Sequence, residues 1–481
     1  MASSMNIKSY LKIGLFYSFT KYISMGIALV RTIFVATALG PELLGSWALI
    51  LLILEYMNYA NLGVFSSMNR DVAVHIDKAG KQKEITKLIG NAICITLIIF
   101  TLLFILLMGM YYFPAQILPP EFYEYYVFLI TMIAFYQLKQ FLNRYLRLYD
   151  KLYQFVILEF LAQLIMFVVI LLSVEEYTIY GVMYSVLISN FFYLFFGFLY
   201  VKGIKLSLDF STAKYLITQG FPMMLYGIFI ILSISIDRIF IAYAFDSRAP
   251  LGLYQIAFTL TNGLFIVFNA LTVLFYPKWL HHFNESNKDK SSIIQSINDQ
   301  SNITELFLVI LSLIGISFVG FFINIFAPEY KTSILICQIL LLAFTVHGKL
   351  FFALTYLVSN NYQMSIVKII FLTIIVALIG NFLLIQLGYG LYGISFATLI
   401  SFYFYGILIY ILMCKTYETE YLKTLFDVFF RLGCLTFISL IILWEEFPLI
   451  WIWLAFFAIY FTKLIAMKDS FRAIKMMLTE S

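Results

Sequence analysis

Charged side chains are scarce in this sequence. Only 12% of the 481 residues are Asp, Glu, Lys or Arg, whereas 63% are hydrophobic and the mean hydropathy is +0.94. Soluble domains contain about 45–50% apolar residues, so this composition excludes a soluble globular protein. Long polar loops are also missing, because the longest, at about residues 276–303, has fewer than thirty residues. Any binding chemistry must therefore lie within the membrane or at its faces.

Cysteine and histidine are few and form no metal-ligand pattern. The sequence has four histidines, and we expect His347, inside an apolar run, to be a hydrogen-bonded packing residue. The four cysteines lie in or at the ends of apolar runs without ligand-like spacing, which favours small core residues over a disulfide or a metal site. They are Cys94, Cys337, Cys414 and Cys434. No metal and no resident cofactor is predicted.

Long apolar runs fill the chain instead. A membrane-spanning helix needs about 20 mostly apolar residues. The runs are continuous and lack the alternation of barrel strands, so each must satisfy its backbone internally as a helix. Fourteen such runs occur at about 13–36, 47–67, 88–113, 126–148, 153–173, 180–201, 215–244, 252–275, 304–326, 333–357, 366–387, 391–413, 427–444 and 449–467. The sequence thus predicts an all-α polytopic membrane protein with about 14 transmembrane helices.

Lys and Arg are distributed unequally between the two sides of the predicted spans. One side, which includes both termini, carries 24 of the 31 basic residues, whereas the other side carries two, Arg248 and Lys331. The positive-inside rule makes the basic side cytoplasmic. Since the net charge of +5 follows from topology, it gives no reason to expect a nucleic-acid partner. A polar N-terminal dodecamer leads into a full-length first span, so we expect no cleavable signal peptide.

The chain repeats itself. The segment "RTIFVATALGPELLGSWAL", from Arg31, aligns without gaps with "RIFIAYAFDSRAPLGLYQI", from Arg238, at an offset of 207 residues. Spans 4 and 5 match spans 10 and 11 at an offset of 209. Six spans are an even number, so the two copies share one orientation, as in transporters with parallel repeats.

This duplication predicts the domain organisation. We expect an N-lobe at 1–203 and a C-lobe at 204–414, each of six helices, around a central cleft. Residues 415–481 would supply two further helices and a cytoplasmic tail. A substrate would sit in the cleft near the membrane midplane.

Arg31 and Arg238 occupy equivalent positions in the two copies. Each could snorkel to the outer interface. We favour a shared anion site, in which two guanidiniums bind phosphate oxygens, because the outer side has few other bases and because the pair recurs. Asp237, about 100° around the helix from Arg238, is either a structural partner of a neighbouring span or an ion-coupling acid.

A polar stripe follows span 8, with Gln255, Thr259, Asn262 and Asn269 on one face. Such a face must contact another helix or water, so it either forms interhelical hydrogen bonds or lines a cavity. The repeat equivalent of Asn262 is Glu55 in span 2. Because both copies place polar groups at one depth, we favour a lined cavity, with Glu55 as a second candidate for ion coupling.

Three lysines complete the predicted site. Lys21 and Lys349 are equally consistent with a basic cavity wall and with snorkelling to the cytoplasmic face. Lys139 lies deeper, beside a polar stripe of span 4 formed by Tyr136, Gln140, Asn143 and Arg147.

Two segments resemble a known family. They are "LGPELLGSWALI", from Leu39, and "NYANLGVFSSMNRDVAVHIDKAGKQKE", from Asn58. They are similar to the first two spans and first cytoplasmic loop of the polysaccharide-exporter branch of the multidrug/oligosaccharidyl-lipid/polysaccharide superfamily, the Wzx-type O-antigen and capsule repeat-unit flippases. The span count and the two six-span halves extend the resemblance over most of the chain. Its motifs, a G-P-E-x-x-G turn and an L-G-(x)n-R-D segment, are loose.

The resemblance implies a function. It implies a non-enzymatic flippase of the bacterial cytoplasmic membrane that moves undecaprenyl-pyrophosphate-linked oligosaccharides outward by alternating access, for surface polysaccharide biosynthesis. Arg and Lys would bind the diphosphate, and Asn, Gln and Tyr the sugars. Membrane lipids would surround it, and a polysaccharide polymerase would act beside it. Relatives commonly use a Na⁺ or H⁺ gradient, which would give Glu55 or Asp237 a coupling role.

Other functions stay open. A lipid II flippase of peptidoglycan synthesis also has fourteen spans and a basic cavity. A MATE-type drug or cation antiporter should have a net acidic cavity, whereas here the bases outnumber the acids. A membrane polymerase or ligase would need a large outer loop with catalytic residues, and the outer loops here are short.

Overall fold

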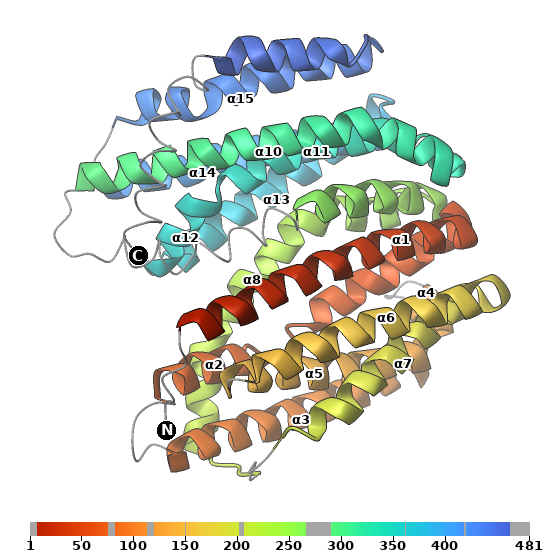
Figure 1. Cartoon of the computed structure of the whole chain (residues 1–481), viewed down its shortest axis with the longest axis vertical. Coiled ribbons are helices and arrows are strands. Elements are labelled where there is room, and N and C mark those ends of the chain that lie inside the picture. Colours follow the sequence, from red (N-terminus) through yellow and green to blue (C-terminus); the bar gives the residue numbers. More distant parts are fainter. Residues whose placement is uncertain are drawn as a thin grey trace. The chain divides into compact units, whose positions relative to one another are not determined.

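A computed structural model describes residues 7–75, 82–112, 120–149, 151–201, 206–265, 290–360, 362–417 and 420–461 of the chain. Over these ranges every regular element is a helix (Figure 1). Ten of the described helices are long and apolar enough to cross a membrane. The predicted all-α membrane fold is confirmed, and the protein is a multi-pass membrane protein.

The described residues form two compact units. Unit 1 comprises the chain up to Ser235 together with Ile241–Gln255, and unit 2 comprises Ile236–Phe240 and the chain from Ile256 onward. Helix α8 (Phe210–Ala244) contributes to both units. The predicted division into lobes at residue 204 stays a prediction.

The first two predicted spans are the two halves of α1 (Ile7–Met57). A kink separates the halves at Gly40, whose φ of 67° and ψ of 171° are not helical. Pro41 follows, and proline both lacks an N–H and disfavours the helical conformation of the preceding residue. Glycine takes the positive φ at little steric cost.

The second predicted span, 47–67, is wrong at its end. The helix ends at Met57, a turn follows, and α2 (Val64–His75) begins after it. Asn61 builds this turn: its Oδ1 accepts from the N–H of Gly63 at 3.1 Å, and its Nδ2 donates to the carbonyl of Asn58 at 3.1 Å. The hydropathy of the segment did not predict the turn, because hydropathy is averaged over many residues and this turn is formed by the hydrogen bonds of one side chain.

The other helices of unit 1 lie close to the predicted spans. The span predicted at 126–148 is reproduced by α5. Helices α6 and α7 pack along each other, α1 packs on α6, and α5 packs on α7 (Figure 1). The bounds are α3 (Gln82–Tyr112), α4 (Pro120–Glu124), α5 (Tyr126–Leu148), α6 (Leu152–Tyr177) and α7 (Ile179–Phe198).

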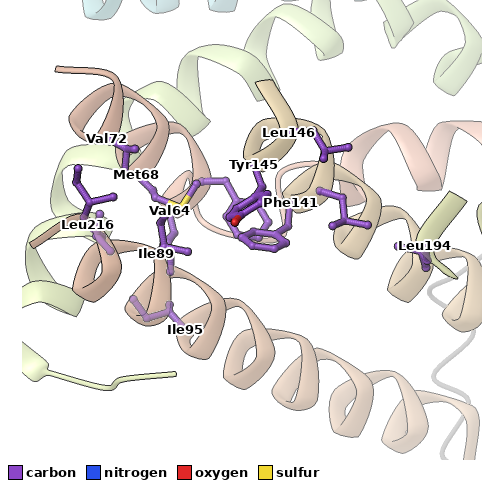
Figure 2. Close-up of a cluster of buried hydrophobic side chains, with 14 of the residues drawn as sticks. Val64, Met68, Val72, Ile89, Ile95, Phe141, Tyr145, Leu146, Leu194 and Leu216 are labelled. Atoms are coloured by element: carbon purple, nitrogen blue, oxygen red, sulfur yellow. The ribbon is translucent and has the colours of Figure 1, made fainter. Parts of the chain in front are cut away.

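A buried apolar cluster fixes α2 against its neighbours. Figure 2 shows Val64, Met68 and Val72 of α2 beside Ile89 of α3 and Phe141 of α5. The α2 residues are spaced by four, which places them on one helix face. This cluster positions the start of α2 and the C-terminal half of α5, where the polar residues discussed below lie.

Unit 2 is built around α11, most of whose side chains are buried between α10 and α14. The tenth predicted span is interrupted after Lys349, where Leu350 separates α11 from α12. The bounds are α10 (Lys290–Phe326), α11 (Ser333–Lys349), α12 (Phe351–Ser359), α13 (Gln363–Gln386), α14 (Gly390–Tyr417) and α15 (Tyr421–Trp444). A short 3₁₀ turn (Pro328–Tyr330) and a final helix (Ile450–Phe461) complete the unit.

Candidate functional site

A hydrogen-bonded polar network joins the end of α1 to α5 in unit 1. Asn58 is its centre: its Nδ2 donates to the Tyr136 hydroxyl at 2.9 Å, and its Oδ1 accepts from Gln140 Nε2 at 3.1 Å. Beside it, Asn61 Nδ2 donates to Gln137 Oε1 at 3.2 Å. Two members of the polar stripe predicted for span 4, Tyr136 and Gln140, are therefore bonded to the turn after α1.

Lys139 lies in a second polar cluster, between α5, α6 and α7. Its Nζ is 3.5 Å from Glu159 Oε1 and 4.8 Å from the ring centroid of Tyr193. Asn143 links the members, because its Nδ2 donates to Glu159 Oε1 at 3.1 Å and its Oδ1 accepts from the Tyr193 hydroxyl. Lys139 is thus neutralised by a carboxylate in unit 1.

Arg31 has a different environment. Its Nη1 donates to Gln163 Oε1 at 2.7 Å and lies 2.9 Å from the sulfur of Met166, both on α6. Among the described residues no carboxylate pairs with it. Glu55, on the same long helix, is half-buried, and Lys21 is exposed near the beginning of α1.

Arg238, the repeat equivalent of Arg31, is buried in unit 2 and only 1% exposed. Its guanidinium carbon lies 3.9 Å from the ring centroid of Phe258, a close cation–π contact. The two arginines are in different units, so their joint phosphate clamp stays a prediction.

Asp237 is buried beside Arg238 but points elsewhere. Its Oδ2 accepts from the Thr398 hydroxyl on α14 at 3.4 Å, and its Oδ1 accepts from the backbone N–H of Arg238 at 2.8 Å. The expectation that Asp237 faces a neighbouring span agrees with this contact. Its role in ion coupling stays a prediction.

Lys349 is wholly buried, which is inconsistent with snorkelling. Its Nζ donates to Glu305 Oε2 on α10 and to the carbonyl of Val428 on α15. Glu305 Oε1 accepts from the hydroxyl of Tyr460 in the final helix at 2.5 Å. Because Glu305 and the Val428 carbonyl already bind the Lys349 ammonium, this geometry favours a structural role for Lys349 over a place in the wall of a substrate cavity. Glu305 was missed because it lies at the very edge of the predicted span.

The predicted stripe of span 8 is only partly described. Residues 249–265 are helical, Gln255 is buried, and Thr259 and Asn262 are half-buried. Asn269 lies outside the described residues.

One basic residue that the sequence analysis did not select as a site residue lies on α5. Arg144 is half-buried on α5, with its guanidinium carbon 5.3 Å from the ring centroid of Phe65. It continues the spacing of four from Tyr136 and Gln140, so helical phase could have identified it.

The turns of the two repeats contact each other in unit 1. Glu42 caps the start of the helix at 249–265, since its carboxylate accepts from the N–H groups of Arg248 and Ala249, each at 2.9 Å, and from the Ser247 hydroxyl at 2.7 Å. Arg248 is held by Glu121 of α4 through two bonds, from Nε at 2.5 Å and from Nη2 at 3.2 Å.

No protein-family model matches the chain, and no curated protein matches it. Solved structures do match. The lipid II flippase MurJ, in an inward closed conformation, is similar at a TM-score of 0.63 and 15% identity, over 96% of this chain and 99% of that chain.

Transporters of the MOP superfamily are also similar. A multidrug resistance MATE family transporter in an inward-facing conformation matches at a TM-score of 0.64 and 14% identity, over 82% of this chain and 94% of its own. A MOP superfamily transporter from Pyrococcus furiosus matches at a TM-score of 0.56 and 14% identity, over 85% of this chain and 96% of its own. The chain therefore has the fold of the flippases and transporters of the MOP superfamily.

Proposed function

We propose that this protein is a flippase of the bacterial cytoplasmic membrane that translocates undecaprenyl-pyrophosphate-linked oligosaccharide repeat units for surface polysaccharide biosynthesis. The observation that carries the proposal is a pair of guanidiniums inside helices of unit 1, Arg31 and Arg144, that lack a carboxylate partner among the described residues. Unpaired guanidiniums within a membrane suit an anionic head group and disfavour a cation.

The fold supports the same class of function. The match to a lipid II flippase extends over 96% of this chain, whereas the match to the MATE transporter extends over 82%. Transport of a lipid-linked head group by alternating access is therefore the preferred function. The substrate is a lipid-linked oligosaccharide, and a polysaccharide polymerase would receive the product.

Two alternatives rest on specific observations. A lipid II flippase is favoured by the extent of the MurJ match, and a MATE-type drug or cation antiporter is favoured by the similarity to MATE transporters. A MATE-type antiporter requires an acidic site. In unit 1, Glu159 is paired with Lys139, which argues against this carboxylate as part of such a site.

Ion coupling is part of the proposal. Asp237 and Glu55 are the acids proposed to bind Na⁺ or H⁺, and no resident cofactor is required. Asp237 has the stronger support, because its carboxylate is buried against Thr398 of a different helix. Binding of a cation there could alter the contact between α8 and α14.

The experiment is deletion of the gene, followed by complementation. Loss of surface polysaccharide, with accumulation of the undecaprenyl-pyrophosphate-linked repeat unit, would support the proposal. Cell lysis with accumulation of lipid II would instead support the first alternative. Normal polysaccharide and normal cell wall, together with drug sensitivity, would support the second.

A further inference from the structure

The hydrogen bonding of Arg144 in unit 1 is incomplete. Its Nη1 is buried and has no hydrogen-bond partner, and no carboxylate in the described part of the chain pairs with it. Buried polar atoms normally have a partner, and a buried charge without one is strongly destabilising. An acceptor that binds at this position would remove that cost.

The surroundings of Arg144 suit an anion. Tyr59 and Tyr136 interact electrostatically with the Arg144 guanidinium. The ring of Phe65 lies 5.3 Å from the guanidinium carbon. Arg147, which also interacts electrostatically with Arg144, is basic too. An aromatic face stabilises a guanidinium without using its N–H donors, so the donors stay available for a ligand.

The amides next to Arg144 are already bonded to each other. Asn58 bonds to Tyr136 and to Gln140, which fixes the Tyr136 hydroxyl on one side of the site. Tyr59 is fixed from another side by α8, because a Cβ built on Gly227 would lie 2.3 Å from its ring. The site is therefore shaped by the protein, and the guanidinium is its unsatisfied donor.

Arg147 shows what an ordinary arginine at this helix end looks like. It is exposed, its Nε donates to the carbonyl of Asn143 at 3.1 Å, and its guanidinium lies 5.6 Å from the ring of Phe155. Both arginines lie in the last turns of α5, which ends at Leu148. Of these two arginines, Arg144 is the one with a buried nitrogen that has no acceptor among the described residues.

We propose that Arg144 binds a phosphate group of a lipid-linked diphosphate in unit 1, with Tyr59 and Tyr136 beside it. The planar guanidinium donates two parallel hydrogen bonds to a phosphate, a geometry that an ammonium cannot reproduce. This inference rests on the proposed function and adds a phosphate-binding residue to it. The same chemistry could be met by a free diphosphate, so the test separates the two sources.

The test measures binding to the full-length protein in phosphatidylcholine nanodiscs by isothermal titration calorimetry. The probes are farnesyl diphosphate, inorganic pyrophosphate and farnesol. We expect Arg144→Gln to weaken farnesyl diphosphate binding by about tenfold or more, and Arg144→Lys to recover only part of the loss. Arg147→Gln is the matched control and should bind within about twofold of the unsubstituted protein.

Each outcome decides the matter. Farnesyl diphosphate binding that depends on Arg144, with no effect on farnesol, supports a lipid-linked phosphate site; pyrophosphate binding of equal strength assigns the site to free anions instead and overturns the lipid-linked part. Unchanged binding by an Arg144→Gln protein of normal thermal stability overturns the proposal. If Arg144→Gln does not fold, Arg144→Lys and Tyr136→Phe test the same site.

The proposed function can fail independently. Failure to restore polysaccharide in the deletion strain, with Arg144-dependent binding of farnesyl diphosphate intact, would reject the repeat-unit substrate and retain the phosphate site. Restored polysaccharide, together with farnesyl diphosphate binding that does not depend on Arg144, would retain the repeat-unit substrate and reject the phosphate site.

Discussion

Gly252 lies against Gly45, its equivalent in the first copy of the repeat. A Cβ built on Gly252 would be 3.0 Å from the backbone nitrogen of Gly45 and 1.9 Å from the carbonyl oxygen of Pro41. In return, a Cβ on Gly45 would be 2.0 Å from the carbonyl oxygen of Arg248, the repeat equivalent of Pro41. The contact is thus reciprocal, as expected where two copies of one turn meet about a two-fold axis.

This contact predicts the effect of adding a methyl group. Gly252→Ala and Gly45→Ala should each lower the free energy of unfolding by about 1–3 kcal/mol, because backbone atoms would have to move. Gly263→Ala is the control, since nothing lies within 4 Å of a Cβ there. Thermal unfolding in detergent measures the difference. Equal stability of Gly252→Ala and Gly263→Ala would show that the turns do not pack as described.

The ion pair of Arg248 and Glu121 should stabilise the same turn. The two side chains are 17% and 8% exposed, so their bidentate contact is screened less than a surface pair. We expect a double-mutant cycle with Arg248→Gln and Glu121→Gln to give a coupling energy of about 1–2 kcal/mol. Additive effects of the two substitutions would mean that the pair contributes nothing.

The role of Lys349 can be decided by removing its partner as well. Lys349→Met alone removes the ammonium that binds the buried Glu305 carboxylate and should destabilise the protein by about 3–5 kcal/mol. Lys349→Met with Glu305→Leu removes both charges and should recover most of the stability. Expression level and thermal unfolding report the fold, and complementation reports transport. A stable double variant without transport would return Lys349 to the substrate site.

Asp237 offers a test of ion coupling. Asp237→Asn keeps the shape of the side chain and its acceptor for Thr398 but removes the charge. We expect a protein of near-normal stability whose transport no longer responds to the Na⁺ or H⁺ gradient. Flipping in proteoliposomes with and without an imposed gradient measures this response, and Glu55→Gln provides the comparison. A wild-type response in Asp237→Asn would leave Glu55 as the candidate.

Asp209 predicts an acid-dependent loss of stability. The hydroxyls of Ser211 and Thr212, together with Lys87, hold the pKa of this carboxyl well below its ordinary value of 3.8. A lowered folded-state pKa stabilises the fold above 3.8, and this stabilisation is lost as the pH falls through the folded pKa.

Two substitutions of Asp209 separate its charge from its cap. Asp209 accepts from the N–H of Thr212 at 3.0 Å at the start of α8. Asn also caps helices well, so Asp209→Asn should flatten the acid dependence with little loss at neutral pH, whereas Asp209→Ala should lower stability at both. An unchanged pH profile in Asp209→Asn, measured by thermal unfolding, would contradict this account.

The sequence predicted many of the residues of the candidate site, but it predicted few of the contacts that these residues make. The sequence identified Arg31, Arg238, Lys139 and Lys349 as costly intramembrane charges. It could not show that Lys349 meets Glu305 or that Lys139 meets Glu159, because those partners lie on other helices. Arg144 was not selected from the sequence, because its contact with Phe65 joins two helices, α5 and α2.

The sequence by itself determined that this chain crosses a membrane many times as helices, because continuous apolar runs admit no other backbone solution in lipid. The sequence also determined the duplication, because Arg31 aligns with Arg238 and both copies contain a Leu-Gly turn. Tertiary structure alone decided that α1 ends at Met57, that Lys139 and Lys349 are paired with carboxylates, and that Nη1 of Arg144 is buried without an acceptor among the described residues. Hydropathy reports the transfer of each residue into lipid, whereas pairing depends on distances between helices that are far apart in the chain.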